Sequence, residues 1–599
     1  MAKDKITSST TAEYFSKNLQ QVGFSSPTKA VLTTLKEAVD NSLDACEEQG
    51  ILPEISVVIE KKGTGTLKNT DLIHIRVEDN GPGLSLDDVP KVFGEYLASS
   101  KFGRGRCSRG QQGIGISAAT TWAQLTSAKG VTVTTKTKTM RQAVQVQVAV
   151  DIKHNKGVLK EKKEGKLKNP HGLSVEFLID GRIQLQGEGG LITYLTGTAL
   201  VNPHLTLHYT LPDQKPVTIS RVSNDCPEVP SATEPHPHTM KLGEFIAHSH
   251  LFGRITLKAW LKKGFSRISD NSLAEFVKNG LNKKMLDMSV DKINEAQFKD
   301  IFSVIHKTEL MSPSTKSVMT IGEESFSKSV RRLGEVDFFS VVTRKPTICD
   351  YKPVAVEVAV ARLKGMTKGE GTEDGPVQVL RFANRVPLQF DKSACAMVKA
   401  IESVNWRAYG LQQPKDSLPS GPYVVAVSLV SPFIKFKNAS KETIDASDEL
   451  VEELRRTLIQ AGQRLSRHIK KEHREQDLEN KLRYIEQFCP ILVDCLCRIT
   501  KAPEKRKKKA TEGLEKILGR DLTAAKKEFK EADLAAKEAA AKGKIQIITD
   551  DAVEAAEPEE KPSKGKKREV KSQQPEAKPA KTAAKSSVKR AASKEKSAT

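Results

Sequence analysis

The sequence lacks the features that mark membrane, secreted or disulfide-rich proteins. No apolar run among its 599 residues approaches the length of a membrane span, and its first ten residues, MAKDKITSST, lack the apolar stretch of a signal peptide. Its eight cysteines include no CxxC pair. The closest group, Cys489, Cys495 and Cys497, lies among apolar residues, which favours helix packing over metal binding. We therefore expect an intracellular, cytoplasmic protein with reduced cysteines and no membrane partner.

The positive charge is concentrated at one end of the chain. The formal net charge is +22, and residues 561–599 alone contain 13 Lys and Arg against 3 Asp and Glu. This segment is rich in Lys, Ala, Ser and Pro and has too few apolar side chains to form a core. A flexible polycation attracts polyanions, so the pattern favours double-stranded DNA as a partner over a merely solubilising role.

The order of helical and strand patterns predicts an α/β fold. Residues 27–49 form a strong helical pattern, with Ser25 or Ser26 as the cap, Pro27 in the first turn and Gly50 after the end. Strand patterns follow in ISVVIEKK, LIHIRVEDN, the alternating run VTVTTKTKTMRQAVQVQVAVDI, and GLSVEFLI. The pattern is that of an α+β sandwich, with helices on one face of a largely antiparallel sheet.

Changes in this pattern predict the domain limits. We expect a first α/β domain over 1–235 and a basic helical domain over 236–312. A second α/β domain follows over 313–475 and passes into a long helix that ends over 476–500. Residues 501–599 form a low-complexity, Lys/Ala-rich segment that we expect to be disordered.

Three polar side chains share one face of the helical pattern at 27–49. Glu37, Asn41 and Asp44 are spaced i, i+4 and i+7, opposite the apolar stripe. Glu37 has the chemistry of a general base toward water, and the Asn41 carbonyl suits Mg²⁺, which prefers oxygen ligands. Taken alone, the trio is better explained by a solvated polar face.

Two glycine-rich stretches change that balance. In EDNGPG, Asp79 ends a strand and can accept a hydrogen bond from an exocyclic amine, while glycines leave room for a flat ring. In SRGQQGIGI, glycines precede the helical run ISAATTWAQL, and the start of a helix favours phosphate. No GxxxxGK[ST] motif occurs, which excludes a P-loop. A base, a Mg²⁺ ligand and a phosphate cradle together predict that the chain binds and hydrolyses ATP.

These motifs resemble a known superfamily. KEAVDNSLDA, EDNGPG and SRGQQGIGI, in this order, resemble the Bergerat nucleotide fold of the GHKL ATPases, which include gyrase, chaperones, mismatch-repair proteins and histidine kinases. LASSKF, VNPH, RFANRVPL and the W-x-x-Y-G-L at 406–411 narrow the resemblance to the B-type subunits of DNA topoisomerase VI. The matches extend in order from about residue 12 to residue 470.

The resemblance implies roles for individual residues of the first domain. Glu37 would activate the attacking water, and Asn41 would bind Mg²⁺. Asp79 would bind the adenine amino group, with Gly81 and Gly83 beside the base.

It also implies a lid with Ser100 and Lys101 near the nucleotide and a lysine that contacts the γ-phosphate. The Ser-Lys-acid context places that lysine at Lys441, with Lys435 and Lys437 as rivals in the longer loop SPFIKFKNASKETID. The residues implied to surround the phosphates are Arg109, Gly110, Gln111, Gln112, Gly113, Ile114, Gly115 and Ile116.

At the level of the whole protein, the resemblance implies a GHKL ATPase domain, a helix-two-turn-helix insert and a transducer. It also implies partnership with a DNA-cleaving A subunit in a heterotetramer of two A and two B subunits. ATP would dimerise two copies and gate passage of double-stranded DNA in a cytoplasmic, nucleoid-associated complex. Whether the insert contacts DNA is left open, as is whether Ser174 replaces a family threonine at the position of Leu173. The alternatives are another GHKL machine, of mismatch-repair or chaperone type, and an inactive scaffold.

Overall fold

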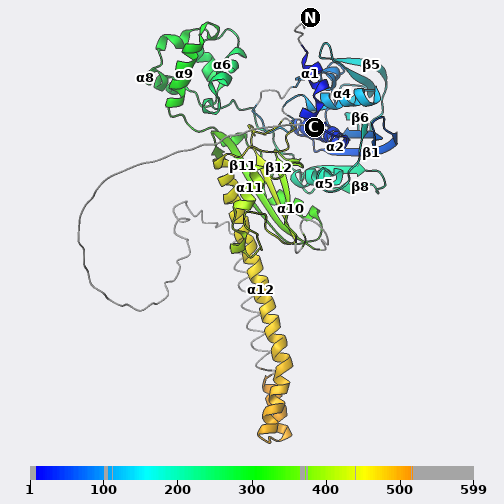
Figure 1. Ribbon diagram of the computed structural model, residues 1–599, viewed down its shortest axis with the longest axis vertical. Coiled ribbons are helices and arrows are strands. Elements are labelled where there is room, and N and C mark those ends of the chain that lie inside the picture. The colour runs from blue at the N-terminus through cyan, green and yellow to red at the C-terminus, as the bar shows by residue number, and fades with distance from the viewer. Residues whose placement is uncertain are drawn as a thin grey trace, which may run out of the picture. The chain divides into compact units, whose positions relative to one another are not determined.

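The computed structural model describes residues 9–99, 105–110, 112–364, 372, 375–438, 440–514 and 516. The chain divides into two compact units, Met1–Leu478 and Glu479–Thr599. The first unit contains two β-sheets with helices packed on them, which confirms the predicted α/β fold class (Figure 1).

The first sheet has eight strands in the order β5-β4-β3-β6-β2-β1-β7-β8. All neighbouring strands are antiparallel except β1 and β7, which are parallel. The register pairs Val57 with Val77 and Val77 with Val175, so apolar side chains line up across the sheet on one face. The strands are β1 (Glu54–Thr64), β2 (Asp71–Asp79), β3 (Val131–Lys136), β4 (Val144–Asp151), β5 (Lys156–Glu164), β6 (Gly172–Gly181), β7 (Thr206–Thr210) and β8 (Val217–Ile219).

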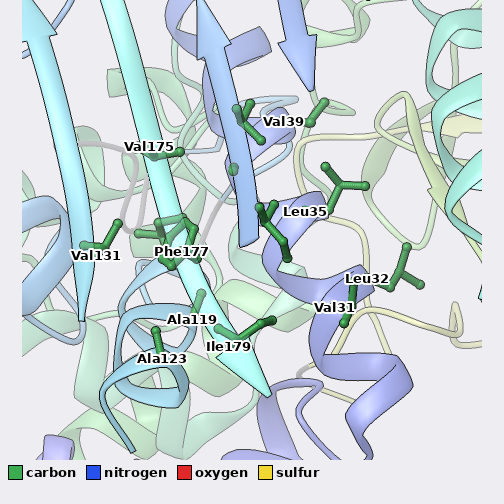
Figure 2. Close-up of a cluster of buried hydrophobic side chains, with 14 of the residues drawn as sticks. Val31, Leu32, Leu35, Val39, Ala119, Ala123, Val131, Val175, Phe177 and Ile179 are labelled. Carbon is green, nitrogen blue, oxygen red and sulfur yellow. The ribbon is translucent and has the colours of Figure 1, made fainter. Parts of the chain in front are cut away.

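Helices cover that apolar face. Figure 2 shows Val31 and Leu35 of α2, Ala119 of α4, and Phe177 and Ile179 of β6 in one cluster of buried side chains. All five side chains are buried, so this interface forms the core of the first domain. The helices of the domain are α1 (Thr11–Lys17), α2 (Pro27–Glu48), α3 (Val89–Gly94), α4 (Gly115–Ser127) and α5 (Leu191–Val201), with the short turn η1 (Leu19–Val22).

The start of α2 matches the predicted helix. Ser26, rather than Ser25, is the cap: its hydroxyl accepts a hydrogen bond from the Lys29 amide at 3.2 Å. Pro27 occupies the first helical position, where its missing N–H costs nothing. This cap fixes where the helix begins and therefore which side chains its inner face presents.

The helical insert has its own small core. Phe245, Trp260, Phe276 and Ile301 are fully buried at its centre. Its elements are η2 (Pro237–Thr239), α6 (Leu242–His250), α7 (Leu257–Gly264), α8 (Asp270–Lys278), η3 (Lys283–Asp287), η4 (Val290–Lys292), α9 (Glu295–Lys307) and η5 (Thr315–Ser317).

The second sheet is covered on both faces. Its strand order is β10-β11-β14-β12-β13, with β9 also paired to β11. Val358 and Ala359, neighbours on β11, belong to opposite core clusters, one with α11 and α12 and the other with α10 and the end of α5. Its elements are α10 (Glu323–Val330), η6 (Arg331–Leu333), β9 (Val336–Thr343), β10 (Thr347–Cys349), β11 (Lys352–Leu363), β12 (Gln378–Ala383), β13 (Val386–Leu388), α11 (Ala396–Ser403), η7 (Trp406–Tyr409) and β14 (Tyr423–Val430).

The long predicted helix is present as α12 (Asp448–Ile499). Leu454, Leu458 and Leu465 of its first half are buried against the second sheet. Within the described ranges, no helix is both long and apolar enough to cross a membrane. The predicted disordered tail lies largely outside the described residues, and the predicted domain limits stay predictions.

Candidate nucleotide-binding site

A cavity of about 300 Å³ lies between α2, the ends of β2 and β6, and the glycine-rich loop before α4. Glu37 and Asn41, one helical turn apart on α2, both line it, together with Asp79 of β2. Asp44, the third residue of the predicted polar face, is buried and not in the cavity wall. The structure therefore brings together a carboxylate, an amide and a second carboxylate from two distant segments.

Asp79 is held in place by three hydrogen bonds. Its Oδ2 accepts from the Ser42 hydroxyl at 2.6 Å, and its Oδ1 accepts from the backbone amides of Gly81 at 2.9 Å and Leu173 at 3.2 Å. Burial raises the pKa of Asp79 to about 6, although these three donors oppose the shift. The carboxylate is thus a fixed acceptor that is mostly ionised at neutral pH.

The glycines after Asp79 are required by close approach. A Cβ on Gly81 would lie 2.9 Å from Asp79 Oδ1. Gly83 has φ +71°, and a Cβ there would overlap the Lys136 carbonyl. Gly83 lines the cavity, whereas Gly81 acts through its amide on Asp79.

The position that departs from the family pattern contributes backbone. Leu173 lines the cavity and donates its amide to Asp79. The Ser174 hydroxyl instead accepts a hydrogen bond from Arg76 Nε at 3.2 Å and does not line the cavity. Neighbouring residues of β6 point to opposite faces of the sheet, which accounts for the difference.

The glycine-rich loop forms the opposite wall. Its cavity-lining residues are Gly110, Gln112, Gly113, Ile114, Gly115 and Ile116. A Cβ on Gly115 would overlap the Glu37 carboxylate, so a larger residue where α4 begins would displace the side chain of the proposed base. Gly113, with φ +63°, accepts a hydrogen bond from the Leu97 amide at 2.9 Å, which ties the loop to the segment before the predicted lid. Ser100, Lys101 and Gln111 lie outside the described residues.

The Arg109 side chain is directed away from the cavity. Its guanidinium is fully buried and donates to Asp44 at 2.7 Å, Glu47 at 2.7 Å and Asn202 at 2.6 Å. Burial opposes the charged form, but Glu47 and Asp44 together raise the pKa of Arg109 above its ordinary value. The Asp44 carboxylate also accepts the backbone amides of Arg109 and Gly110, each at 3.2 Å, and thereby holds the loop.

Lys441 reaches the site from the second domain. It lines the cavity with Ser440 and Glu442, and its Nζ donates to the Arg109 carbonyl at 3.0 Å. Lys435, by contrast, is exposed and pairs with Asp445 at 3.1 Å. Lys437 donates to the Ala394 carbonyl at 3.0 Å and is not in the cavity wall.

The donor set fits a Mg²⁺ ion that arrives with a nucleotide. A Cβ on Gly110 would lie 3.2 Å from Asn41 Oδ1, so the glycine keeps space open around this oxygen at the cavity wall. Over the described part of the chain, no group of three or more His, Cys, Asp or Glu side chains could hold a metal. Mg²⁺ commonly takes one or two protein oxygens and completes its shell with water and substrate phosphates.

Several residues of the site gave no clear signal in the sequence. Gln389 and Phe390, directly after RFANRVPL, complete the cavity wall from the second domain. Lys36 also lines the cavity, and burial lowers its pKa. Nearby, burial raises the pKa of Asp40 to about 7, and Tyr194 Oη lies 3.1 Å from Asp40 Oδ1.

Comparison with known families defines the class of protein. Residues 29–175 match the family described as histidine kinase-, DNA gyrase B- and HSP90-like ATPase. Residues 313–481 match the transducer of the topoisomerase VI B subunit. The chain therefore combines a GHKL ATPase domain with a transducer domain.

Whole-chain relatives make the assignment specific. The chain is 35% identical over 489 residues to the B subunit of type 2 DNA topoisomerase 6 from Archaeoglobus fulgidus, covering 82% of this chain and 79% of the relative. The chain is also similar to the B subunit of type 2 DNA topoisomerase 6 from Methanococcoides burtonii, with 35% identity over 77% of this chain and 72% of the relative. The same subunit from Pyrococcus abyssi is 32% identical over 83% of this chain and 92% of the relative. The chain belongs to the topoisomerase VI B-subunit family, an assignment that excludes the mismatch-repair and chaperone alternatives.

Proposed function

We propose that this chain binds Mg²⁺–ATP in the cavity beside α2 and hydrolyses it. Asp79 accepts a hydrogen bond from the adenine amine, the loop over 109–116 surrounds the phosphates, and Glu37 takes a proton from the attacking water. Asn41 holds the Mg²⁺, which neutralises charge on the phosphates when bound. One observation carries the proposal: a single cavity is lined both by a fixed buried acceptor, Asp79, and by Glu37 beside a glycine-rich helix start.

Lys441 is proposed to contact the γ-phosphate. A lysine that already reaches the loop carbonyl beside Gly110 needs only a short movement to reach a phosphate held by that loop. Because it comes from the transducer, its contact would make the position of the transducer depend on the bound nucleotide. Ser100 and Lys101 are proposed to close over the nucleotide as a lid.

ATP binding is proposed to dimerise two copies and gate the passage of double-stranded DNA. The relatives are named as subunits of a type 2 DNA topoisomerase, and this chain would act with a DNA-cleaving A subunit in a heterotetramer of two A and two B subunits. The net charge of +22 suits a nucleoid-associated, intracellular protein that works on a polyanion.

The second half of α12 is proposed to dock the A subunit. A row of exposed apolar side chains follows a four-residue spacing along one face: Tyr484, Phe488, Leu492 and Leu496, with exposed fractions of 66%, 50%, 56% and 51%. Exposed apolar rows of this kind mark protein interaction surfaces.

Glu37→Gln tests the catalytic proposal. The amide keeps the size of the side chain but cannot take a proton, so ATP should still bind while hydrolysis falls on the order of 10²-fold or more. Closed dimers should accumulate. The measurements are steady-state ATPase, nucleotide binding by calorimetry, and relaxation of supercoiled DNA with the A subunit.

Glu60→Gln, which makes the same change at an exposed position on β1, is the matched control and should behave as wild type. Wild-type turnover in Glu37→Gln would refute the assignment of the base. Absence of turnover in the wild-type complex would support the inactive-scaffold alternative.

A further inference from the structure

A buried ion cluster joins the ATPase domain to the transducer behind the nucleotide cavity. Its centre is Glu47, one turn after Asp44 near the end of α2, whose side chain is 2% exposed. Arg109 donates two hydrogen bonds to this carboxylate, at 2.7 and 2.9 Å. Arg385 of the transducer donates two more, at 2.6 and 3.1 Å. One carboxylate is thus shared by two arginines from different domains.

The charges in the cluster balance. Glu47 and Asp44 face Arg109 and Arg385, and burial lowers the pKa of His204, which favours its neutral form. His204 Nε2 therefore donates to Glu47, at 2.8 Å, since an ionised carboxylate only accepts. Burial opposes ionisation of Glu47, but the two arginines hold its pKa well below the ordinary value.

The backbone at Arg385 supports a specific role for its side chain. Asn384 and Arg385 form the two-residue turn between β12 and β13, with φ +47° and +63°. Both central positions of such a turn favour glycine or asparagine, so an arginine there carries a conformational cost. The Asn202 side chain also holds the turn by donating to the Arg385 carbonyl at 3.3 Å.

Two links of unequal strength therefore connect the nucleotide loop to the transducer. Lys441 makes a single, partly buried hydrogen bond to the Arg109 carbonyl. Exchanging such a bond with water costs little, whereas separating a buried, bidentate ion pair is strongly unfavourable because it leaves an uncompensated buried charge. A movement of the transducer would break the first link and keep the second.

We propose that the Glu47–Arg109–Arg385 cluster is the fixed pivot about which the transducer moves when Lys441 gains or loses its phosphate contact. Arg385 is then a positioning residue: it touches no nucleotide, and it sets where the transducer sits relative to the loop before Gly110. The inference deepens the proposed function and rests on it. The motifs VNPH and RFANRVPL supply three residues of this ion cluster and its hydrogen-bond partners: Asn202, His204 and Arg385.

Arg385→Met tests the pivot in the complete complex with the A subunit. The apolar side chain removes the interdomain pair but leaves Glu47 bonded to Arg109 and His204. We expect ADP affinity within about twofold of wild type, continued ATP hydrolysis, and at least a tenfold drop in DNA relaxation events per ATP hydrolysed. Arg385→Lys, which retains charge without a bidentate fork, should give an intermediate ratio and serves as the test if the first variant does not fold.

Arg344→Met is the matched control. It removes a partly buried arginine pair, to Glu453 at 2.7 Å, that does not involve the ATPase domain. It should lower thermal stability while leaving the number of relaxation events per ATP unchanged. A wild-type ratio in the Arg385 variants would overturn the pivot, as would equal losses of nucleotide affinity and relaxation. Failure of the wild-type complex to hydrolyse ATP would instead overturn the proposed function.

Discussion

At the scale of single residues, Asp79 makes the clearest prediction about pH. Its pKa of about 6 lies above the ordinary value of 3.8 because the carboxyl is buried. Since adenine would need the ionised form as its acceptor, ADP affinity should fall as pH drops through 6, by about tenfold between pH 7 and pH 5. Titration calorimetry over this range measures the effect.

The raised pKa of Asp79 means that the expected fall in ADP affinity at low pH is not caused by unfolding at this group. A buried acid whose pKa is raised favours the protonated native state, so this group adds stability as pH falls from about 6 toward 3.8. Asp79→Asn is the control: it should bind ADP about 1–3 kcal/mol more weakly at pH 7 and lose the Asp79 part of the pH dependence, while sharing the titration of the nucleotide phosphates. Equal pH profiles for the two proteins would contradict the adenine contact.

A second residue-scale prediction concerns the lysine of the transducer. Lys441→Ala should leave ADP affinity nearly unchanged and lower ATP hydrolysis on the order of 10-fold or more, because a γ-phosphate contact exists only with ATP. Lys435→Ala and Lys437→Ala, outside the cavity wall, should hydrolyse ATP as wild type does. Steady-state ATPase of all three variants with the A subunit decides the matter. If Lys435→Ala or Lys437→Ala abolished hydrolysis while Lys441→Ala remained active, the γ-phosphate contact would belong to Lys435 or Lys437 instead.

At the scale of elements, the start of α4 is packed against α2 without room for a methyl group. Gly115→Ala should push the Glu37 carboxylate aside and lower kcat strongly, with a smaller effect on ADP binding. Gly243→Ala is the control, because a Cβ there meets nothing within 4 Å. Parallel kinetics and thermal melts separate displacement of the base from general destabilisation. A normal kcat in Gly115→Ala would show that the glycine-rich loop shifts to make room and that the Glu37 carboxylate keeps its position.

The second half of α12 makes a prediction about assembly. Leu492→Asp places a charge in the exposed apolar row and should weaken binding of the A subunit by about tenfold or more, without altering the ATPase fold. Gln487→Asp adds the same charge at an exposed position of the same helix, outside that row. Analytical ultracentrifugation of mixtures with the A subunit compares the two. Unchanged association of Leu492→Asp would remove this helix as the docking surface.

Also at this scale, the sequence pattern predicted those features of the site that depend on residues close together in the chain. The spacing of Glu37 and Asn41 on one helix, the strand that ends at Asp79 and the glycines before α4 follow from periodicity and turn chemistry. Pattern did not predict the Ser42 hydroxyl on Asp79, or that Arg109 turns inward while its neighbour Gly110 faces the cavity. Those facts depend on contacts between residues that are distant in sequence, Ser42 with Asp79 and Asn202 with Arg109, and a local pattern does not encode them.

At the scale of the whole molecule, the nucleotide site is shared between two domains. The ATPase domain supplies Glu37, Asp79 and the glycine-rich loop to the cavity wall, and the transducer supplies Gln389, Phe390 and Lys441. An ion pair between Lys29 and Glu442, at 2.8 Å, crosses the same boundary at the cavity rim. The transducer therefore forms part of the cavity wall together with the ATPase domain.

The apolar end of α5 has a practical consequence for dissecting the protein. Leu200 and Val201 are 1% and 0% exposed because Phe326 and Phe382 of the transducer cover them. A fragment that stops at residue 235 would present this patch to water and hold Glu47 with only one of its two arginines. Such a fragment should self-associate, and its kinetics would describe an incomplete pocket. A fragment that keeps the whole cavity wall must therefore extend through the transducer.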